Sequence, residues 1–128
     1  MFSCTEKRCH NLIVLMPEIM ELNKEALKWH IDTLILAILD ERDSYGYEIA
    51  KIVREKTTFE LKDGTMYVSL KRLESKELIK SYWGNEQGAG SRRKYYNITD
   101  EGKKSLDIKI QEWDFVQNIM NQFLKGRR

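Results

Sequence analysis

The feature that most constrains this chain is a pair of short strand patterns separated by a glycine-rich loop. In the first pattern Ile79, Ser81 and Trp83 alternate with the residues between them, and residues 92–98 form the second. The loop between them, residues 84–91, is polar and contains three glycines. This arrangement predicts a β-hairpin with a long tip.

Three helical segments precede this hairpin and a fourth follows it. Apolar side chains recur at helical spacing within residues 25–39, 45–55, 65–76 and 100–125. Residues 1–22 show no such pattern and are expected to form an extension. The order of elements predicts a mostly helical α+β fold, with a winged helix-turn-helix domain over residues 23–98 and a dimerisation helix over residues 99–128.

Polar residues in front of the helical segments mark where the helices are expected to begin. Asp43 or Ser44 can cap the second segment, Asp63 the third and Thr99 the last, because their side-chain oxygens can accept from free backbone N–H groups.

The charge of the chain is concentrated in its middle. The formal net charge is only +2, but residues 62–94 contain eight basic and four acidic residues and so carry +4, which leaves −2 for the rest. A basic middle in a nearly neutral chain indicates a surface that binds a polyanion.

The third helical segment has an apolar stripe, formed by Met66, Leu70 and Leu73, and a polar face that the stripe leaves free. A helix presented in this way fits the major groove of duplex DNA, where hydroxyl and cationic side chains reach phosphates and base edges. The expected DNA-binding residues on the helix are Thr65, Tyr67, Ser69, Lys71 and Arg72. The hairpin adds Arg92, Arg93 and Lys94.

Each of these groups has a plainer interpretation when it is taken alone. Lys71 and Arg72 are also typical of a solvated helix face, and residues 92–94 could protect an edge strand from aggregation. Their ordered occurrence on a helix and on the hairpin that follows favours DNA binding.

The last helical segment carries two apolar lines. One line consists of Leu106, Ile110, Trp113, Val116 or Gln117, Met120 and Leu124. The other consists of Ile108, Phe115, Ile119 and Phe123. A single helix at the end of a small domain has too few internal partners to cover both, so we expect a homodimer with two-fold symmetry that binds a palindromic operator.

Several short motifs together resemble those of PadR-like transcriptional regulators. They are Tyr45-Gly46-Tyr47-Glu48-Ile49, Asp63-Gly64-Thr65-Met66-Tyr67, Leu70-Lys71-Arg72-Leu73-Glu74, Leu78-Ile79, Tyr82-Trp83, Arg92-Arg93-Lys94-Tyr95-Tyr96 and Ile98-Thr99-Glu101-Gly102. The similarity extends over about residues 23–124. One departure is Val68, which stands where the family usually has proline or a small residue.

The resemblance implies a bacterial, dimeric repressor that leaves its operator when a small molecule binds. In some short members a tryptophan of the last helix lines a pore at the dimer centre and stacks on planar apolar drugs, and Trp113 matches that position. A purely structural place in the dimer core is an equal alternative for this side chain. The residues expected at the dimer interface or effector site are Trp113, Ile110, Val116, Met120 and Trp29.

No constellation of catalytic residues is recognisable, so we expect no enzymatic activity and no cofactor. Cys4, Cys9 and His10 do not have standard zinc-ligand spacing, which leaves a metal- or redox-sensing regulator as a minor alternative. A winged helix that binds a protein instead of DNA is the other alternative. The early apolar run, residues 12–16, is too short for a signal peptide or a membrane span, so a cytoplasmic protein is expected, and Met20 is a candidate alternative start.

Overall fold

The computed structural model describes residues 26–85 and 92–127. The chain divides into two units at the boundary between Ile31 and Asp32. In the first unit, residues 26–28 form one helical turn, and a turn at Trp29 and His30 follows, in which the His30 N–H donates to the Leu27 carbonyl at 2.8 Å. The prediction of one helix over residues 25–39 is therefore wrong, because this tight turn interrupts it.

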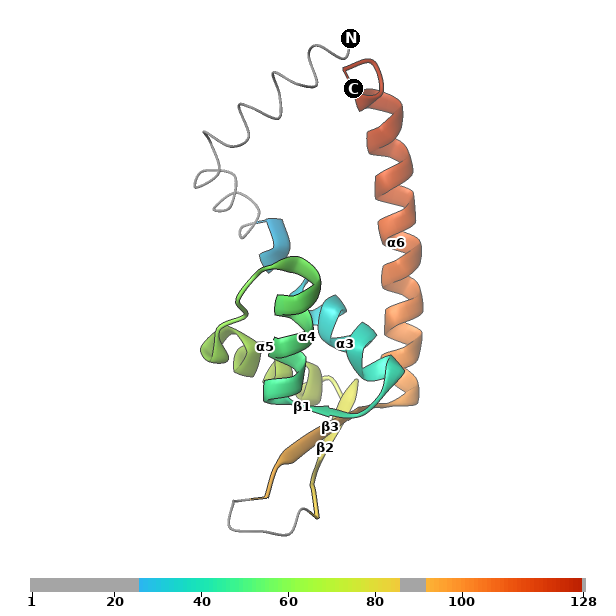
Figure 1. The fold of residues 1–128 in the computed structure, drawn as a ribbon. Coiled ribbons are helices and arrows are strands. Elements are labelled where there is room, and N and C mark those ends of the chain that lie inside the picture. The colour runs from blue at the N-terminus through green and yellow to red at the C-terminus, as the bar shows by residue number, and fades with distance from the viewer. Residues whose placement is uncertain (1–25, 86–91, 128) are drawn as a thin grey trace. The chain divides into compact units, whose positions relative to one another are not determined.

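The second unit is built on three helices, α3 (Ile31–Glu41), α4 (Gly46–Thr57) and α5 (Asp63–Ser75) (Figure 1). Their apolar faces meet in a core that also receives side chains from the sheet and from the last helix. The stripe predicted for the third segment is confirmed, since Met66, Leu70 and Leu73 are all buried. The other core residues of this unit are Ile35, Leu36, Leu39, Ile49, Val53, Ile79, Tyr96, Ile98 and Leu106.

A three-stranded antiparallel sheet lies against these helices, in the order β1-β3-β2. The predicted hairpin is confirmed as β2 (Ile79–Trp83) and β3 (Lys94–Ile98). Its partner β1 (Ser44–Tyr45) is absent from the sequence-based prediction, because two residues have no detectable periodicity. The mostly helical winged helix-turn-helix fold is thereby confirmed.

Two of the three expected helix caps are not formed. Ser44 donates its hydroxyl to the Arg42 carbonyl, and α4 begins after Tyr45, whose backbone N–H donates to the Glu48 carboxylate at 3.2 Å. Asp63 is the first residue of α5 instead of its cap. Strand pairing by Ser44 and Tyr45 explains the first difference, since it delays the start of α4 until after Tyr45, and Tyr45 instead of Asp43 or Ser44 then occupies the cap position.

The third cap is confirmed and anchors the last helix, α6 (Asp100–Leu124). The Thr99 Oγ1 accepts from the Gly102 N–H at 3.0 Å and donates to the Leu78 carbonyl, also at 3.0 Å. Gly102 packs so tightly here that a Cβ atom on it would lie 2.1 Å from the Leu78 carbonyl oxygen. The start of α6 is thus fixed against the turn that leads into β2.

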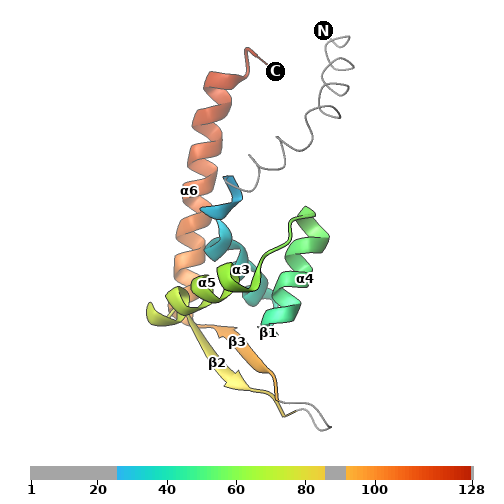
Figure 2. The same cartoon turned by 90° about the vertical axis from the view of Figure 1, so that its left-hand side faces the viewer.

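The rest of α6 extends away from the sheet (Figures 1 and 2). Leu106 is its last buried apolar residue, and the large apolar side chains beyond it are 38% to 81% exposed. Within the described ranges, no helix has the length and hydropathy needed to cross a membrane.

Candidate nucleic-acid interface

One face of α5 is free of the core. Thr65, Tyr67 and Lys71 lie on it and are exposed, as the sequence predicted. Ser69 does not belong to this face, because its side chain is only 1% exposed. It follows Met66 by three residues and precedes Leu73 by four, so helical spacing places it on the buried side, and the prediction that it lies on the free face is wrong.

Val68 is an exposed apolar residue on the same face, and the sequence-based list of DNA-binding residues omits it. Its side chain is 60% exposed. Gly64 lies one turn before it and Lys71 one turn after it, and nothing lies within 4 Å of where a Cβ atom on Gly64 would be. The helix backbone is therefore accessible beside Val68, a feature that helical spacing from the buried stripe could have indicated.

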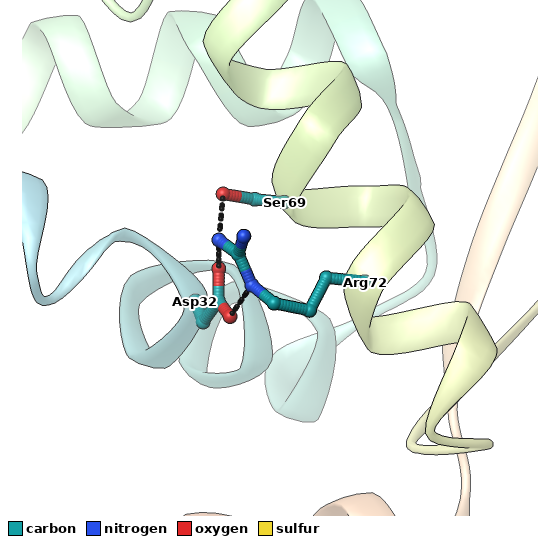
Figure 3. A network of polar contacts seen from close by, with 3 residues as sticks. All are labelled: Asp32, Ser69 and Arg72. Carbon is teal, nitrogen blue, oxygen red and sulfur yellow. Dashed lines mark hydrogen bonds and ion pairs between the residues drawn. The ribbon is translucent and has the colours of Figure 1, made fainter.

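Arg72 is held by a network of polar contacts with Asp32 on α3 and Ser69 on α5 (Figure 3). Its Nε donates to one carboxylate oxygen of Asp32 at 2.8 Å and its Nη2 to the other at 2.9 Å. The same Nη2 donates to the Ser69 hydroxyl at 3.2 Å. The guanidinium is thus committed to a bidentate ion pair within the protein.

The surroundings of Asp32 favour its charged form. Burial raises the pKa of this carboxyl, but hydrogen bonds from Arg72 and Ser69 and the charges of Arg72 and Lys76 outweigh burial. The pKa of Asp32 therefore lies below its usual value. At neutral pH both members of the ion pair are charged.

The three basic residues that lead from the hairpin loop into β3 are oriented by neighbouring groups. Arg92 donates from Nε to the Gly84 carbonyl at 3.1 Å, across the hairpin. The Arg93 guanidinium lies 4.8 Å from the centre of the Tyr45 ring, and the Lys94 ammonium lies 5.8 Å from that of Tyr96. These contacts are cation–π interactions that leave the charged groups exposed.

A hollow of about 480 Å³ brings the helix and the hairpin together. Tyr67 of α5, Lys94 of β3 and Arg93, which directly precedes β3, all line it. These three predicted residues therefore face one common space. The other predicted residues, Thr65, Ser69, Lys71, Arg72 and Arg92, do not line it. Two residues of α4 that the sequence-based prediction missed, Tyr47 and Arg54, line it as well. Hydroxyl groups and cations around a concave surface are suited to an extended anionic backbone.

A row of tyrosines crosses the sheet on the face that carries Tyr45. Tyr95 pairs with Tyr45 on one side and with Tyr82 on the other, with ring centres 5.4 Å and 5.7 Å apart. Asp43 closes the row by accepting from the Tyr82 hydroxyl at 2.6 Å and from the Asn97 amide at 3.2 Å. The turn before β1 therefore fixes both strands of the hairpin.

The residues predicted for the dimer interface or effector site fall into two groups. Ile110, Trp113, Val116 and Met120 lie along α6 and are about half exposed. Trp29 lies in the first unit, is 80% exposed and has the Lys28 ammonium 5.9 Å from its ring centre. Trp83 is exposed on β2.

The described part of the chain holds no group of three or more metal-ligating side chains. Cys4, Cys9 and His10, the residues weighed as a metal or redox site, lie outside the described residues.

Comparison with known proteins assigns this architecture. Residues 35–108 match the model of the transcriptional regulator PadR-like family. A protein of Lysinibacillus sphaericus, named Uncharacterized protein X, is 37% identical over 107 residues, which cover 82% of this chain and 97% of that protein.

Two solved structures extend the similarity to the fold. A PadR family transcription regulator from hypervirulent Clostridium difficile is 64% identical, with a TM-score of 0.69 over 74% of this chain and 98% of that one. A transcriptional regulator from Clostridium thermocellum is 42% identical, with a TM-score of 0.70 over 78% of this chain and 98% of that one.

Proposed function

The chain belongs to the PadR-like family of transcriptional regulators, and from this premise we propose that it is a sequence-specific repressor that a small apolar effector releases from DNA. As a member of this family it is a DNA-binding regulator and not an enzyme. We propose that residues 23–98 bind a palindromic operator and that residues 99–128 pair two chains. Its place of action is then the cytoplasm, where a bacterial chromosome lies.

The hollow shared by α5 and β3 is the observation that carries the DNA-binding part of this proposal. It places Tyr67 of the helix and two cations of the hairpin around one concave surface. Three basic side chains line it, Arg54, Arg93 and Lys94, against two acidic ones, Glu60 and Asp63. A phosphate backbone that follows this surface would set α5 into the major groove and the hairpin against the adjoining groove.

The apolar surface of α6 supports the homodimer. Beyond Leu106 both apolar lines of the helix are exposed to a degree that is unusual for so many large side chains. Pairing with the same helix of a second chain would bury them at the spacing of a coiled coil.

Trp113 supports an effector site at the same interface. Its ring is about half exposed on the apolar line that contains Ile110 and Met120. A tryptophan face offers a large apolar area and a negative quadrupole, and both suit a planar aromatic ligand. The assignment of Trp29 to this site stays a prediction.

Fluorescence anisotropy with labelled duplex DNA tests the DNA-binding face. An operator is first selected from random duplexes and from the DNA upstream of the gene, and it is titrated at several salt concentrations beside a scrambled duplex. Lys71→Ala and Arg93→Ala should each weaken binding to both duplexes and lower the salt slope by about one, because one phosphate contact is lost. Tyr67→Ala should reduce the preference for the operator more than it reduces the affinity for scrambled DNA.

Lys103→Ala on α6 is the matched control, since it removes the same charge from an exposed residue that lies on neither α5 nor the hairpin. Unchanged affinity in all three test variants would refute this binding face. Equal affinity of the wild-type protein for operator and scrambled duplexes would refute sequence-specific regulation and favour a winged helix that binds a protein.

Release of the labelled operator tests the effector. Planar aromatic drugs should lower the anisotropy of the wild-type complex and quench tryptophan fluorescence. Trp113→Ala should abolish both effects, whereas Phe123→Ala, which truncates an exposed aromatic residue of the other apolar line, should retain them. Equal release from both variants would remove Trp113 from the effector site.

A further inference from the structure

The ion pair with Asp32 occupies two of the three guanidinium nitrogens of Arg72, whereas a cation that contacts DNA needs its donors free. Two guanidinium nitrogens each donate to a different carboxylate oxygen, at 2.8 Å and 2.9 Å, and one of these nitrogens also reaches Ser69. Such a fork-to-fork arrangement is the strong and directional form of the arginine–carboxylate interaction. An isolated lysine such as Lys71 on the neighbouring free face has no comparable restraint in its contacts with phosphate.

A bidentate contact with a phosphate through Nε and Nη2 would require Arg72 to leave this pair, since both nitrogens already donate to Asp32. The arginine would then exchange one bidentate anionic partner for another, and the gain would be small. The exchange would also leave the partly buried Asp32 carboxylate unpaired near a polyanion, which costs free energy through repulsion and through burial of an unpaired charge.

The pair joins two helices that are far apart in sequence. Asp32 lies in the first turn of α3 and Arg72 in the last turn of α5, and the two are separated by 40 residues. Reading of base edges requires a helix to be held within about 0.5 Å and 10–20° of its productive position. Thr65 and Tyr67 lie near the start of α5, and the bidentate contact lies near its other end. This contact restrains the rotation of the helix about its own axis.

We infer that Arg72 is a positioning residue, which together with Asp32 fixes the orientation of α5 for base reading and does not itself contact DNA. The inference rests on the proposed function, because it assigns Arg72 a role within the proposed DNA-binding face. Asp32 is then needed for operator recognition although it is an acidic residue close to a DNA-binding helix.

The two alternative roles of Arg72, phosphate contact and positioning of α5, predict opposite effects of removing the Asp32 carboxylate. If Arg72 contacted phosphate, Asp32→Ala would free the guanidinium and raise the affinity for DNA. If Arg72 positions α5, Asp32→Ala should lower the affinity for the selected operator, by about fivefold for an interaction of ordinary strength. The affinity for the scrambled duplex should stay the same or rise, because one negative charge near the DNA is removed.

Arg72 variants give a second, independent readout. Arg72→Ala should lower operator affinity without changing the salt slope, in contrast to Lys71→Ala, which should lower the slope by about one. Arg72→Lys keeps the charge but loses the pair of donor nitrogens that bind both carboxylate oxygens of Asp32, so it should behave like Arg72→Ala. The double variant Asp32→Ala/Arg72→Ala should lose no more operator affinity than either single variant.

The experiment is one set of anisotropy titrations on these variants, accompanied by urea unfolding of the same proteins. A rise in operator affinity for Asp32→Ala, or a lower salt slope for Arg72→Ala, would overturn the inference. If the wild-type protein shows no operator preference, the proposed function fails. The urea unfolding experiment still tests whether the ion pair of Asp32 and Arg72 holds α3 and α5 together. Non-additive shifts of the urea midpoint in the two single variants and the double variant support a clamp between α3 and α5, whereas additive shifts overturn it.

Discussion

Val68 lies at the centre of the exposed face of α5. Gly64 precedes it by four residues and Lys71 follows it by three, so the three residues share one side of the helix. An exposed β-branched side chain at this place forms no hydrogen bonds with water. It can instead pack against the C5-methyl group of thymine, which projects into the major groove. At the residue scale, Val68 is therefore the side chain of this face best suited to select one base by apolar contact.

Replacement of Val68 by alanine should weaken operator binding by about fourfold, the value expected when one of the two methyl groups that are removed is buried against a base. The measurement is anisotropy with operators in which single thymines are replaced by deoxyuridine, which lacks the methyl group. One replacement in each half-site should weaken binding by the wild-type protein and have no effect on the Val68→Ala variant. Equal effects of every replacement on both proteins would show that Val68 contacts no thymine methyl.

The Tyr82 hydroxyl provides a titration that reports on the hairpin anchor. Its hydrogen bond to Asp43 raises the pKa of Tyr82 from the ordinary 10.0 to about 12. A pKa that is raised in the folded state means that the contribution of this contact to stability is complete below pH 10 and is lost as the pH rises toward 12.

Spectrophotometric titration of the tyrosines should therefore show a step near pH 12 that disappears in Tyr82→Phe. In Asp43→Asn the charged acceptor is removed, and the Tyr82 step should move toward pH 10. An unchanged step near pH 12 in both variants would assign it to another tyrosine. Tyr96 is another tyrosine whose pKa is raised, through burial and the nearby Tyr67 and Glu74.

At the scale of elements, the docking of α6 depends on a close approach between a helix and a backbone carbonyl. The first turn of α6 lies on the turn that precedes β2, and Gly102 is the point of contact. A Cβ atom at this position would lie 2.1 Å from the Leu78 oxygen and 2.7 Å from the Ile98 Cγ1. Neither neighbour is the far end of a flexible side chain, so the helix itself would have to shift.

Gly102→Ala should lower the free energy of unfolding by about 2 kcal/mol, because overpacking outweighs the gain of up to ~1 kcal/mol in helix propensity. Urea unfolding followed by circular dichroism measures the change. Gly64→Ala in α5 is the matched control, and with nothing within 4 Å of its Cβ it should be neutral or slightly stabilising. Equal stabilities of the two variants would show that the contact between α6 and Leu78 imposes no steric limit.

At the scale of the whole molecule, the same helix that is anchored at Gly102 carries the exposed apolar surface. The anchored end fixes the direction of α6 relative to α5 within one chain, and pairing along its length would fix the relation between two DNA-binding domains. The distance between two recognition helices would then be set by α6, at about one turn of DNA, roughly 34 Å, for a symmetric dimer.

Ile110→Glu combined with Met120→Glu should convert the proposed dimer to a monomer, because two charges cannot be buried in an apolar helix pair without partners. Sedimentation velocity should show the lower mass, and operator affinity should fall by at least tenfold through the loss of the second half-site. Gln111→Glu with Asn118→Glu is the matched control, since it adds the same charge to the polar face of α6 and should remain dimeric. A wild-type chain that sediments as a monomer would contradict the dimer.

The sequence alone determined the features that depend on local pattern. The periodicity of apolar residues located α4 and α5 and the long α6, the alternation around a glycine-rich loop located β2 and β3, and Thr99 marked the start of the last helix. The exposed positions of Thr65, Tyr67 and Lys71 also followed from the stripe on the opposite face of their helix. Such features are readable because neighbours along the chain produce them.

Only the tertiary structure decided which distant groups meet. The pairing of β1 with β3 joins Ser44 to Tyr96, and the ion pair of Arg72 is formed with Asp32, 40 residues away. Local pattern could not reveal either contact, because a two-residue strand has no periodicity and a single charge on a helix does not specify its partner. The free energy of such contacts arises only when the packed core brings the segments together. The same packing pairs Arg72, which the sequence predicts to be free for DNA, with Asp32.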